Sequence, residues 1–238
     1  MNVAKAAKSI QPKVSVVIPT YNEAASIEQT LSPLQHLRRS GDIEIVVSDG
    51  GSADGTRELV APMVDRCVND SQGRAAQMNS GARVSSAELI LFLHADTQLP
   101  DNFLSPLIKS SGEDENAQAW GFFPVRLSGK HHLFRLIEGC INLRSRLTSM
   151  ATGDQALFVS RALWRELEGF ADIALMEDVD FSRRARKLAK AKVQPSFVTT
   201  SSRRWEENGI VSTVVLMWRL RWLYFCGVSP RALAKLYR

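Results

Sequence analysis

The chain has 238 residues, of which 45% are hydrophobic and 23% charged, a composition typical of a soluble globular protein. This length accommodates one large domain with a substantial core, with or without appendages. The three cysteines, Cys67, Cys140 and Cys226, show neither pairing nor ligand spacing, which argues against a zinc site. We therefore expect reduced, buried thiols in a cytosolic protein.

The net charge of +5 is distributed unevenly along the chain. Residues 1–119 contain 10 Lys and Arg against 15 Asp and Glu, a net charge of −5, whereas residues 120–238 contain 20 against 10, a net charge of +10. A basic half indicates an anionic partner, such as nucleic acid, lipid headgroups or a phosphorylated substrate, or else a solvated cationic face.

Neither targeting signals nor membrane spans are predicted. Residues 1–13 are interpreted as a flexible arm, and they lack the apolar segment of a secretory signal. The most apolar stretch, residues 210–228, carries Arg219 and Arg221 in its middle, so it does not qualify as a membrane span. We expect a cytoplasmic protein, located at the inner face of the membrane if it binds lipid.

Strands and helices alternate in the first half of the chain. Apolar runs predict strands over 14–19, where Pro19 would end the strand, and over 42–51, 66–68 and 89–93. Helices are predicted over 27–37, 54–64 and 73–86. This alternation favours an α/β domain with a largely parallel sheet. Ligands of such sheets bind beyond the carboxyl ends of the strands, so the tails PTYNE, SDGGS and HAD would lie at one edge.

The second half is less regular. The segment 120–127 contains Pro124 and is predicted to be an edge strand, and 153–160 is predicted to be a strand. Helices are predicted over 131–147, 161–167 and 174–191, the last of which starts acidic and ends basic. The tail from Trp205 onward is predicted to be helical, with a break at 227–230, and neither a repeat nor a domain linker is apparent.

Several polar residues follow the predicted strands. Asp49 could accept hydrogen bonds from a base or ribose, or it could cap the following helix, and Gly50 and Gly51 are free to adopt positive φ. Gly73 and Arg74 open a helix, where backbone N–H groups and a guanidinium suit a phosphate or a base oxygen. The sequence His94-Ala95-Asp96 is either a site for Mg²⁺ or Mn²⁺ or a polar hinge at the end of a core strand.

Two further motifs lie in the second half. MEDVD contains the acids Glu177, Asp178 and Asp180, which either complement the helix dipole or include a general base. A base of this kind would have to be partly buried next to another acid. In SSRRWEENG, two arginines beside Trp205 could clamp a diphosphate or a sugar face, or could flank an aromatic core anchor.

Taken in order, seven motifs resemble the family 2 glycosyltransferases, and most of all a bacterial subgroup of them. They are PTYNE (19–23), SDGGSADGT (48–56), GRAAQMNSG (73–81), HAD (94–96), GDQ (153–155), ED (177–178) and RRW (203–205). The resemblance implies a GT-A fold, with a mostly parallel central sheet flanked by helices. It covers residues 14–206, with a nucleotide-binding half at 14–99 and an acceptor-binding half at 100–206, followed by a helical tail at 207–238.

The resemblance also implies roles for individual residues. The nucleotide would be bound by Thr20, Glu23, Asp49, Gly50, Arg74 and His94, and a divalent metal, Mn²⁺ or Mg²⁺, by Asp96. Asp178 would be the general base, with Glu177 beside it, and the acceptor or diphosphate would meet Asp154, Gln155, Arg204 and Trp205. One departure is His94, which replaces the first aspartate of the family's D-x-D motif; it weakens the expected ribose contact and leaves the base undetermined.

The function implied is inverting transfer of a sugar from a nucleotide-sugar donor to an acceptor hydroxyl. A sugar nucleotidylyltransferase is the nearest rival enzyme, but PTYNEA lacks the Gly-rich basic loop of that class. The alternative from another class is a non-catalytic protein that binds a nucleotide or anionic lipid on the same scaffold. A nucleic-acid partner is not expected, because the basic residues form no recognisable module.

The tail alternates aromatic residues with arginine. Trp218, Trp222, Tyr224 and Phe225 lie among Arg219 and Arg221, a pattern typical of helices in a membrane interface. This favours peripheral membrane contact and a lipid or otherwise apolar acceptor. The alternatives are that these aromatic side chains pack on the domain or form a homodimer.

Overall fold

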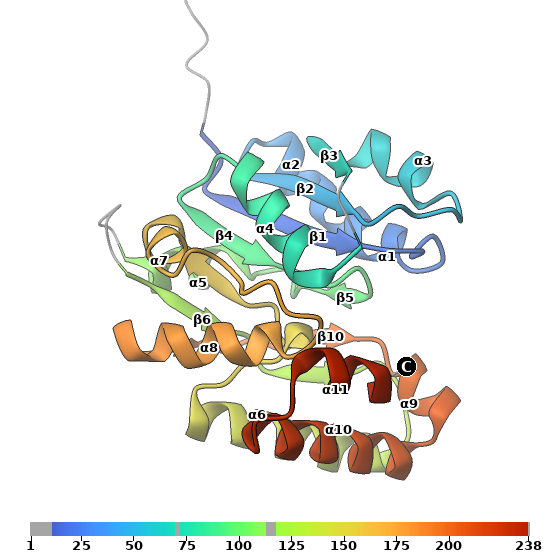
Figure 1. The fold of residues 1–238 in the computed structure, drawn as a ribbon. Helices are drawn as coiled ribbons and strands as arrows, with labels where there is room; N and C mark the ends of the chain where they lie inside the picture. Colours follow the sequence, from blue (N-terminus) through green and yellow to red (C-terminus); the bar gives the residue numbers. More distant parts are fainter. Residues whose placement is uncertain (1–10, 70–71, 113–117, 238) are drawn as a thin grey trace, which may run out of the picture.

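A seven-stranded, mostly parallel sheet runs through the middle of the molecule (Figure 1). The computed structural model describes residues 11–69, 72–112 and 118–237, so most of the predicted arm lies outside the described residues. The spatial order is β3 (Arg66–Asn69), β2 (Ile43–Asp49), β1 (Val14–Thr20), β4 (Leu89–Phe92), β8 (Phe158–Ser160), β6 (Trp120–Phe122) and β9 (Lys192–Val193). Among these described strands only β8 is antiparallel to its neighbours. The predicted fold class is therefore confirmed.

The centre of the sheet is formed by β1 and β2, which are buried at every position. Their runs of Val and Ile suit strands that are covered on both faces. The prediction that Pro19 ends the first strand is wrong, because β1 continues to Thr20. The backbone of Pro19 presents its hydrogen-bonding groups toward β4, as that of Val17 does, but β4 pairs with β1 only as far as Val17. The missing N–H of Pro19 therefore interrupts no ladder.

Prolines divide the helices of the first half. The predicted helix over 27–37 consists of α1 (Ile27–Leu31), the 3₁₀ turn η1 (Ser32–Leu34) and α2 (Gln35–Arg39). The helix predicted over 54–64 consists of α3 (Thr56–Val60) and the turn η2 (Ala61–Met63). Pro33 and Pro62 lie near the start of these turns, where proline removes no helical hydrogen bond. By contrast, α4 (Arg74–Val84) is continuous.

Two predictions for the second half are wrong. The single edge strand over 120–127 is divided at Pro124 between two sheets: β6 lies between β8 and β9, and β7 (Val125–Leu127) belongs to a three-stranded sheet ordered β5, β10, β7. The partners of β7 in that sheet are β5 (Thr97–Gln98) and β10 (Val198–Thr200). The strand predicted over 153–160 begins only at Phe158, because Gly153–Gln155 form the 3₁₀ turn η3.

Helices cover both faces of the large sheet. One hydrophobic cluster joins α1, α3 and α5 (Leu104–Ser111) to the sheet, and another joins α4, α7 (Arg161–Glu166) and α8 (Glu177–Leu188) to its other face. The remaining helices are α6 (His132–Thr148), α9 (Arg203–Asn208), α10 (Ile210–Phe225) and α11 (Pro230–Tyr237). Figure 1 shows α6 and α10 at the end of the molecule opposite to α2 and α3.

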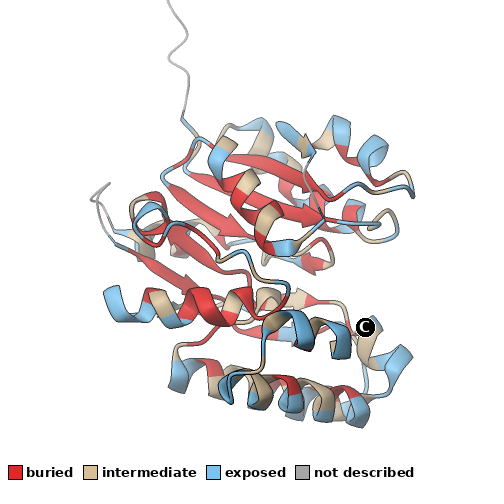
Figure 2. Ribbon diagram, viewed as in Figure 1, coloured by how far each residue is buried: buried red, intermediate tan, exposed pale blue. Residues whose placement is uncertain are grey.

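The tail packs on the domain through one of its faces only. Leu220 of α10 and Leu233 of α11 are fully buried in a third cluster, together with Met176 and Val179 at the start of α8. The other face of α10 remains exposed (Figure 2). Within the part of the chain that the structure describes, no helix is both long and apolar enough to cross a membrane.

The expectation of buried cysteines is wrong. Cys67, Cys140 and Cys226 are all free and exposed. The reason is their position: Cys67 lies on the edge strand β3, Cys140 on the outer surface of α6, and Cys226 immediately after α10.

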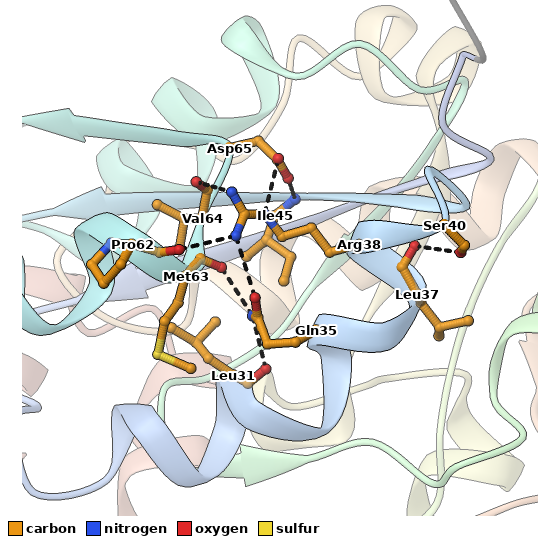
Figure 3. Close-up of polar contacts among 10 residues, drawn as sticks. All are labelled: Leu31, Gln35, Leu37, Arg38, Ser40, Ile45, Pro62, Met63, Val64 and Asp65. Carbon is orange, nitrogen blue, oxygen red and sulfur yellow. Dashed lines mark hydrogen bonds and ion pairs between the residues drawn. The ribbon is translucent and has the colours of Figure 1, made fainter.

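A polar network centred on Arg38 connects α2 to η2 and the residues that follow it (Figure 3). The guanidinium donates to the carbonyl oxygens of Pro62 and Val64 at 3.2 and 2.6 Å, and to the carboxylate of Asp65 at 2.9 Å. The other oxygen of Asp65 accepts from the backbone N–H of Ile45 at 2.8 Å. One arginine thus satisfies carbonyl groups that the short 3₁₀ turn leaves unpaired and ties them to β2.

Arg38→Ala should lower the free energy of unfolding by about 2–3 kcal/mol, because it leaves several partly buried acceptors without donors. Urea unfolding followed by circular dichroism measures this change. The exposed neighbour provides the matched control: Arg39→Ala should change stability by no more than about 0.5 kcal/mol. Equal effects of the two substitutions would contradict the role assigned to Arg38.

Candidate functional site

The carboxyl ends of β1, β2 and β4 meet at one edge of the sheet. Thr20 lies directly opposite Asp49 in the register of β1 and β2, and the hydroxyl of Thr20 donates to the Asp49 carboxylate at 3.1 Å. β4 pairs with the other side of β1 and leads into His94 and Asp96. Parallel pairing therefore brings three separate sequence motifs to one place, as the sequence predicted.

Asp49 is buried and engaged within its own loop. Its carboxylate accepts hydrogen bonds from the backbone N–H groups of Gly51 and Ser52 at 3.0 and 2.9 Å, and from the Ser52 hydroxyl at 2.5 Å. These contacts order the loop after β2. Of the two glycines, only Gly51 has positive φ, at 87°. Gly50 is tightly packed instead: a Cβ atom there would lie 3.0 Å from the amide of Gln77, which would have to shift slightly.

Asp96 faces a small polar cavity of about 130 Å³. Hydroxyl and amide side chains line this cavity, among them Thr30, Gln98, Thr199 and Ser201. Burial raises the pKa of Asp96, although the charge of Arg203 opposes the shift. Glu23 belongs to the same group, because burial raises its pKa and both Asp96 and Arg203 interact with it. Arg203 thus belongs to this group; it is one of the two arginines beside Trp205 in the sequence motif, although the resemblance assigned a role only to Arg204.

His94 is packed against the loop that contains Gly153. Its Nε2 atom is buried and has no hydrogen-bond partner among the described residues. Burial, together with the positive charge of Arg74, lowers the pKa of His94 to about 3. A Cβ atom at position 153 would lie 2.4 Å from Nε2, so glycine is required there. His94 is therefore neutral at physiological pH.

The three acids at the start of α8 have different surroundings. Glu177 is buried and pairs with Arg74 at 3.4 Å; burial raises its pKa while Arg74 lowers it. Asp178 is only partly buried, and one of its oxygens accepts from the backbone N–H of Gly153 at 2.7 Å. Asp180 pairs with Arg183 and Arg184 at 3.2 and 2.7 Å. Asp180 is thus a structural residue, while Glu177 and Asp178 face Arg74 and the Gly153 loop.

The loop before β8 carries the next two candidates. The Oδ1 atom of Asp154 is buried without a partner in the described part of the chain, and burial raises the pKa of this carboxyl group. Gln155 is completely buried, and its side-chain oxygen accepts from Thr152 N–H at 3.0 Å and from the Ser145 hydroxyl at 2.8 Å. The amide of Gln155 thus shapes the loop that presents Asp154.

The last helix also reaches this region. Arg204 donates to the carbonyl oxygen of Tyr237 at 2.7 Å, and its guanidinium lies 3.7 Å from the centre of the Tyr237 ring. The phenol of Tyr237 also interacts with Arg74: burial alone would lower the pKa of Arg74, but Glu177 and this phenol raise it. Trp205 follows in α9 and is partly buried. Tyr237 carried no sequence signal, since it belongs to no recognisable motif.

The described residues contain no group of three or more His, Cys, Asp and Glu side chains arranged for a metal ion. Asp96 supplies one partly buried carboxylate, whose only side-chain donor among the described residues is the Thr97 hydroxyl at 3.4 Å. A carboxylate with this spare capacity fits Mg²⁺ or Mn²⁺ when substrate phosphates and water complete the shell, because such ions often take only one or two protein ligands.

The fold is that of the GT-A glycosyltransferases. The first 349 residues of TarS from S. aureus in complex with UDP-GlcNAc superpose with a TM-score of 0.65 and 19% identity, over 79% of this chain and 58% of that one. The mannosyltransferase PcManGT from Pyrobaculum calidifontis, in complex with GDP-Man and Mn²⁺, gives a TM-score of 0.56 and 21% identity, over 79% and 56% of the two chains.

The chain belongs to glycosyl transferase family 2, whose model matches residues 15–165. Validoxylamine A glucosyltransferase of Streptomyces hygroscopicus subsp. jinggangensis (strain 5008) is 43% identical over 95 residues, which are 37% of this chain and 22% of that protein. The probable glycosyltransferase YdaM of Bacillus subtilis (strain 168) is 28% identical over 233 residues, 89% of this chain and 54% of that protein. This chain thus spans at most about half of either relative.

The buried neutral state of His94 predicts a pH-dependent stability. Between the ordinary pKa of 6.5 and about 3, the unfolded chain binds a proton that the folded chain does not. The free energy of unfolding should therefore fall as the pH falls below 6.5, by up to about 1.4 kcal/mol per pH unit. Urea unfolding at pH 7 and pH 5, with EDTA present, should show that His94→Gln loses about 1–2 kcal/mol less than the wild type.

The matched control for this measurement is the exposed His36→Gln, which should keep the wild-type dependence on pH. If His94→Gln and the wild type lose the same stability between pH 7 and pH 5, His94 does not titrate as described.

Proposed function

We propose that the chain catalyses inverting transfer of a sugar from a nucleotide-diphosphate sugar to an acceptor hydroxyl. The observation that carries this proposal is the position of Asp178. Its carboxylate is partly buried, is oriented by the N–H of Gly153, and belongs to the same loop-and-helix group as Glu177 and Arg74. A carboxylate that is held in place but still accessible suits a general base.

The donor would occupy the edge formed by the strand ends. We assign Thr20, Glu23, Asp49, Gly50, Arg74 and His94 to the nucleotide side of the donor. The neighbour TarS was solved with UDP-GlcNAc and PcManGT with GDP-Man, which supports a nucleotide-sugar but leaves base and sugar open. The neutral His94 offers no negative charge to a ribose hydroxyl, so the ribose contact differs from that of an aspartate.

Asp96 would hold a divalent cation, Mn²⁺ or Mg²⁺, with Arg203 beside it. When bound, the cation neutralises the charge that develops on the departing diphosphate. The mannosyltransferase neighbour was solved with Mn²⁺, which supports this assignment. Because burial raises the pKa of Asp96, cation binding would compete with the proton at a higher pH than at an exposed aspartate, so the affinity for the metal would increase with pH.

The reaction needs no other chemistry from the protein. The acceptor oxygen forms a bond to the anomeric carbon on the face opposite the diphosphate, while Asp178 takes the hydroxyl proton. The bond from the anomeric carbon to the phosphate oxygen breaks, and the nucleoside diphosphate leaves with its electron pair. Attack from the opposite face inverts the configuration. Arg74 and Arg204 can compensate negative charge near the leaving group.

Asp178→Asn should reduce the turnover number by about 10²–10⁴-fold, because it removes the proton acceptor and keeps the shape of the side chain. The affinity for the nucleoside diphosphate should change less than about twofold, since the base contacts the acceptor. Release of nucleoside diphosphate from a panel of nucleotide-sugars, with Mg²⁺ or Mn²⁺, measures turnover, and calorimetry measures binding. The exposed Asp172→Asn is the matched control.

The competing proposal is a non-catalytic protein that binds a nucleotide or an anionic lipid on this scaffold. Donor binding without turnover, in the presence of any acceptor fraction and either metal, would favour that alternative. Turnover that depends on Asp178 would exclude it.

We further propose that the exposed face of α10 binds an anionic membrane surface. Five large apolar side chains form a stripe along this helix, each between 57% and 72% exposed: Val211, Val215, Trp218, Trp222 and Phe225. Residues 210–237 contain Arg219, Arg221, Arg231 and Lys235 but no acid, so their charge complements anionic lipid. One relative, a glucosyltransferase of Campylobacter jejuni, is named for an undecaprenol-linked substrate, which supports a lipid acceptor and contact with a membrane.

The double substitution Trp218→Ser and Trp222→Ser should weaken binding to phosphatidylglycerol-containing vesicles by at least about tenfold, because two large apolar side chains no longer insert. Vesicle sedimentation measures binding. Leu59→Ser, which removes an exposed apolar side chain from α3, is the control and should bind like the wild type. A wild-type dimer that the double substitution dissociates, without any vesicle binding, would instead identify the stripe as an interface between two copies.

A further inference from the structure

Two arginines from different helices converge on the loop that carries Asp154. Arg144 lies on α6 and donates to the hydroxyl of Ser145 at 3.0 Å, and Ser145 donates in turn to Gln155 at 2.8 Å. Arg221 lies on α10, next to the buried Leu220. The charges of Asp154 and Asp178 act on both arginines, and the charge of Arg221 acts on Arg144. The two arginines and Asp154 therefore lie near the proposed base, Asp178.

These groups have hydrogen-bonding capacity that the described residues do not use. The Nε atom of Arg144 and the Oδ1 atom of Asp154 are both buried without a partner. Neither arginine forms a direct ion pair within the described ranges of the chain. An unpaired buried donor and acceptor are each unfavourable for folding, and such groups call for an explanation.

The charges around the two arginines indicate which kind of ligand could supply the missing hydrogen-bond partners. Burial, together with the charge of Arg221, lowers the pKa of Arg144 to about 10, and burial also lowers that of Arg221, while the charges of Asp154 and Asp178 oppose both shifts. Two neighbouring, partly buried cations without direct ion pairs repel each other. An anion between them would relieve this repulsion. The same region offers an unpaired carboxyl oxygen, which suits a hydroxyl group of the same ligand.

We propose that Arg144 and Arg221 form a subsite for a phosphate group carried by the acceptor. One phosphate group has enough oxygens to accept hydrogen bonds from both guanidinium groups. A carboxylate has only two oxygens, and a single bidentate arginine would occupy both. The subsite would lie on the acceptor side, with Asp154 and Asp178, whereas the cations that act on Asp96 are Arg203 and Arg74. This inference rests on the proposed function, since it names the class of acceptor that Asp178 would activate.

The test uses the full chain with inorganic phosphate as the probe. Phosphate is titrated calorimetrically in the presence of saturating UDP and Mg²⁺, so that the proposed diphosphate side is already occupied. Arg144→Gln and Arg221→Gln should each weaken phosphate binding by at least about tenfold, the usual effect of losing hydrogen bonds to a charged group. Their affinity for UDP should stay within about twofold of the wild type. Arg146→Gln, an exposed arginine on the same helix, is the matched control.

Three results would overturn the subsite. Phosphate could bind both variants as tightly as the wild type, or it could bind only when UDP is absent, which would place it on the donor side. The third is a large loss of thermal stability in both variants with unchanged affinity for phosphate, since that marks a structural role. We expect the opposite: removing a partly buried cation that has no direct ion pair should leave the melting temperature unchanged or raise it. If neither UDP nor GDP binds, the proposed donor site is rejected, and the loss of phosphate binding in Arg144→Gln and Arg221→Gln still tests the subsite.

The phosphate can belong to a lipid or to a water-soluble ester. Glycerol 3-phosphate and vesicles of phosphatidylcholine with phosphatidic acid present the same monoester in the two forms. Binding of either ligand should depend on Arg144 and Arg221. If the vesicles bind more tightly than glycerol 3-phosphate, and this difference is lost when Trp218 and Trp222 are replaced by serine, the phosphate belongs to a lipid. If the two ligands bind equally, it belongs to a water-soluble ester. If both ligands bind the Arg144→Gln and Arg221→Gln variants as tightly as they bind the wild type, the subsite is rejected.

Discussion

Parallel pairing of β2, β1 and β4 is the constraint on which the rest of the molecule depends. These strands are buried on both faces, so their register is fixed by packing as well as by backbone hydrogen bonds. Because parallel strands all end at the same edge, each loop that follows a strand opens into the same region. The hydrogen bond between Thr20 and Asp49 is a direct consequence, since the register places the two residues opposite each other. A shift of register would separate Thr20 from Asp49.

The region at this edge is where the protein tolerates unfavourable burial. His94 and Asp154 each place a polar atom in the interior without a partner among the described residues. Burial raises the pKa values of Asp96 and Glu177, which favours their neutral forms. Other polar groups find partners within the chain, as Arg38 does at η2 and as Arg161 does with the carbonyl groups that precede β4, although Ser48, Trp164 and Gln194 also leave an atom unpaired within the described ranges. At a site, an unpaired polar atom beside groups with shifted pKa values indicates a binding region, because ligands can supply the missing partners.

The sequence predicted the first half of the fold well, because long buried strands and amphipathic helices repeat there with short connections. The second half was harder for a physical reason. Its strands have two or three residues, too few to show a period, and Pro124 divides one apolar segment between two sheets. For the site, the motifs at strand ends predicted which residues would meet. Arg144, Arg221 and Tyr237 could not be predicted, since each reaches the site from a helix whose position depends on tertiary packing.

The tail connects these observations, because α10 has two faces with different environments. Its inner face holds Leu220 in the core, and Arg221 follows it beside Asp154 and Asp178. The outer face carries the exposed stripe with Trp218 and Trp222. A surface that binds the stripe would therefore lie a single helix diameter, about 10 Å, from the charged groups of the inner face. An acceptor anchored in that surface would need to extend only this far to bring a phosphate to the arginines and a hydroxyl to Asp178. Docking and acceptor binding would thus use different faces of one helix.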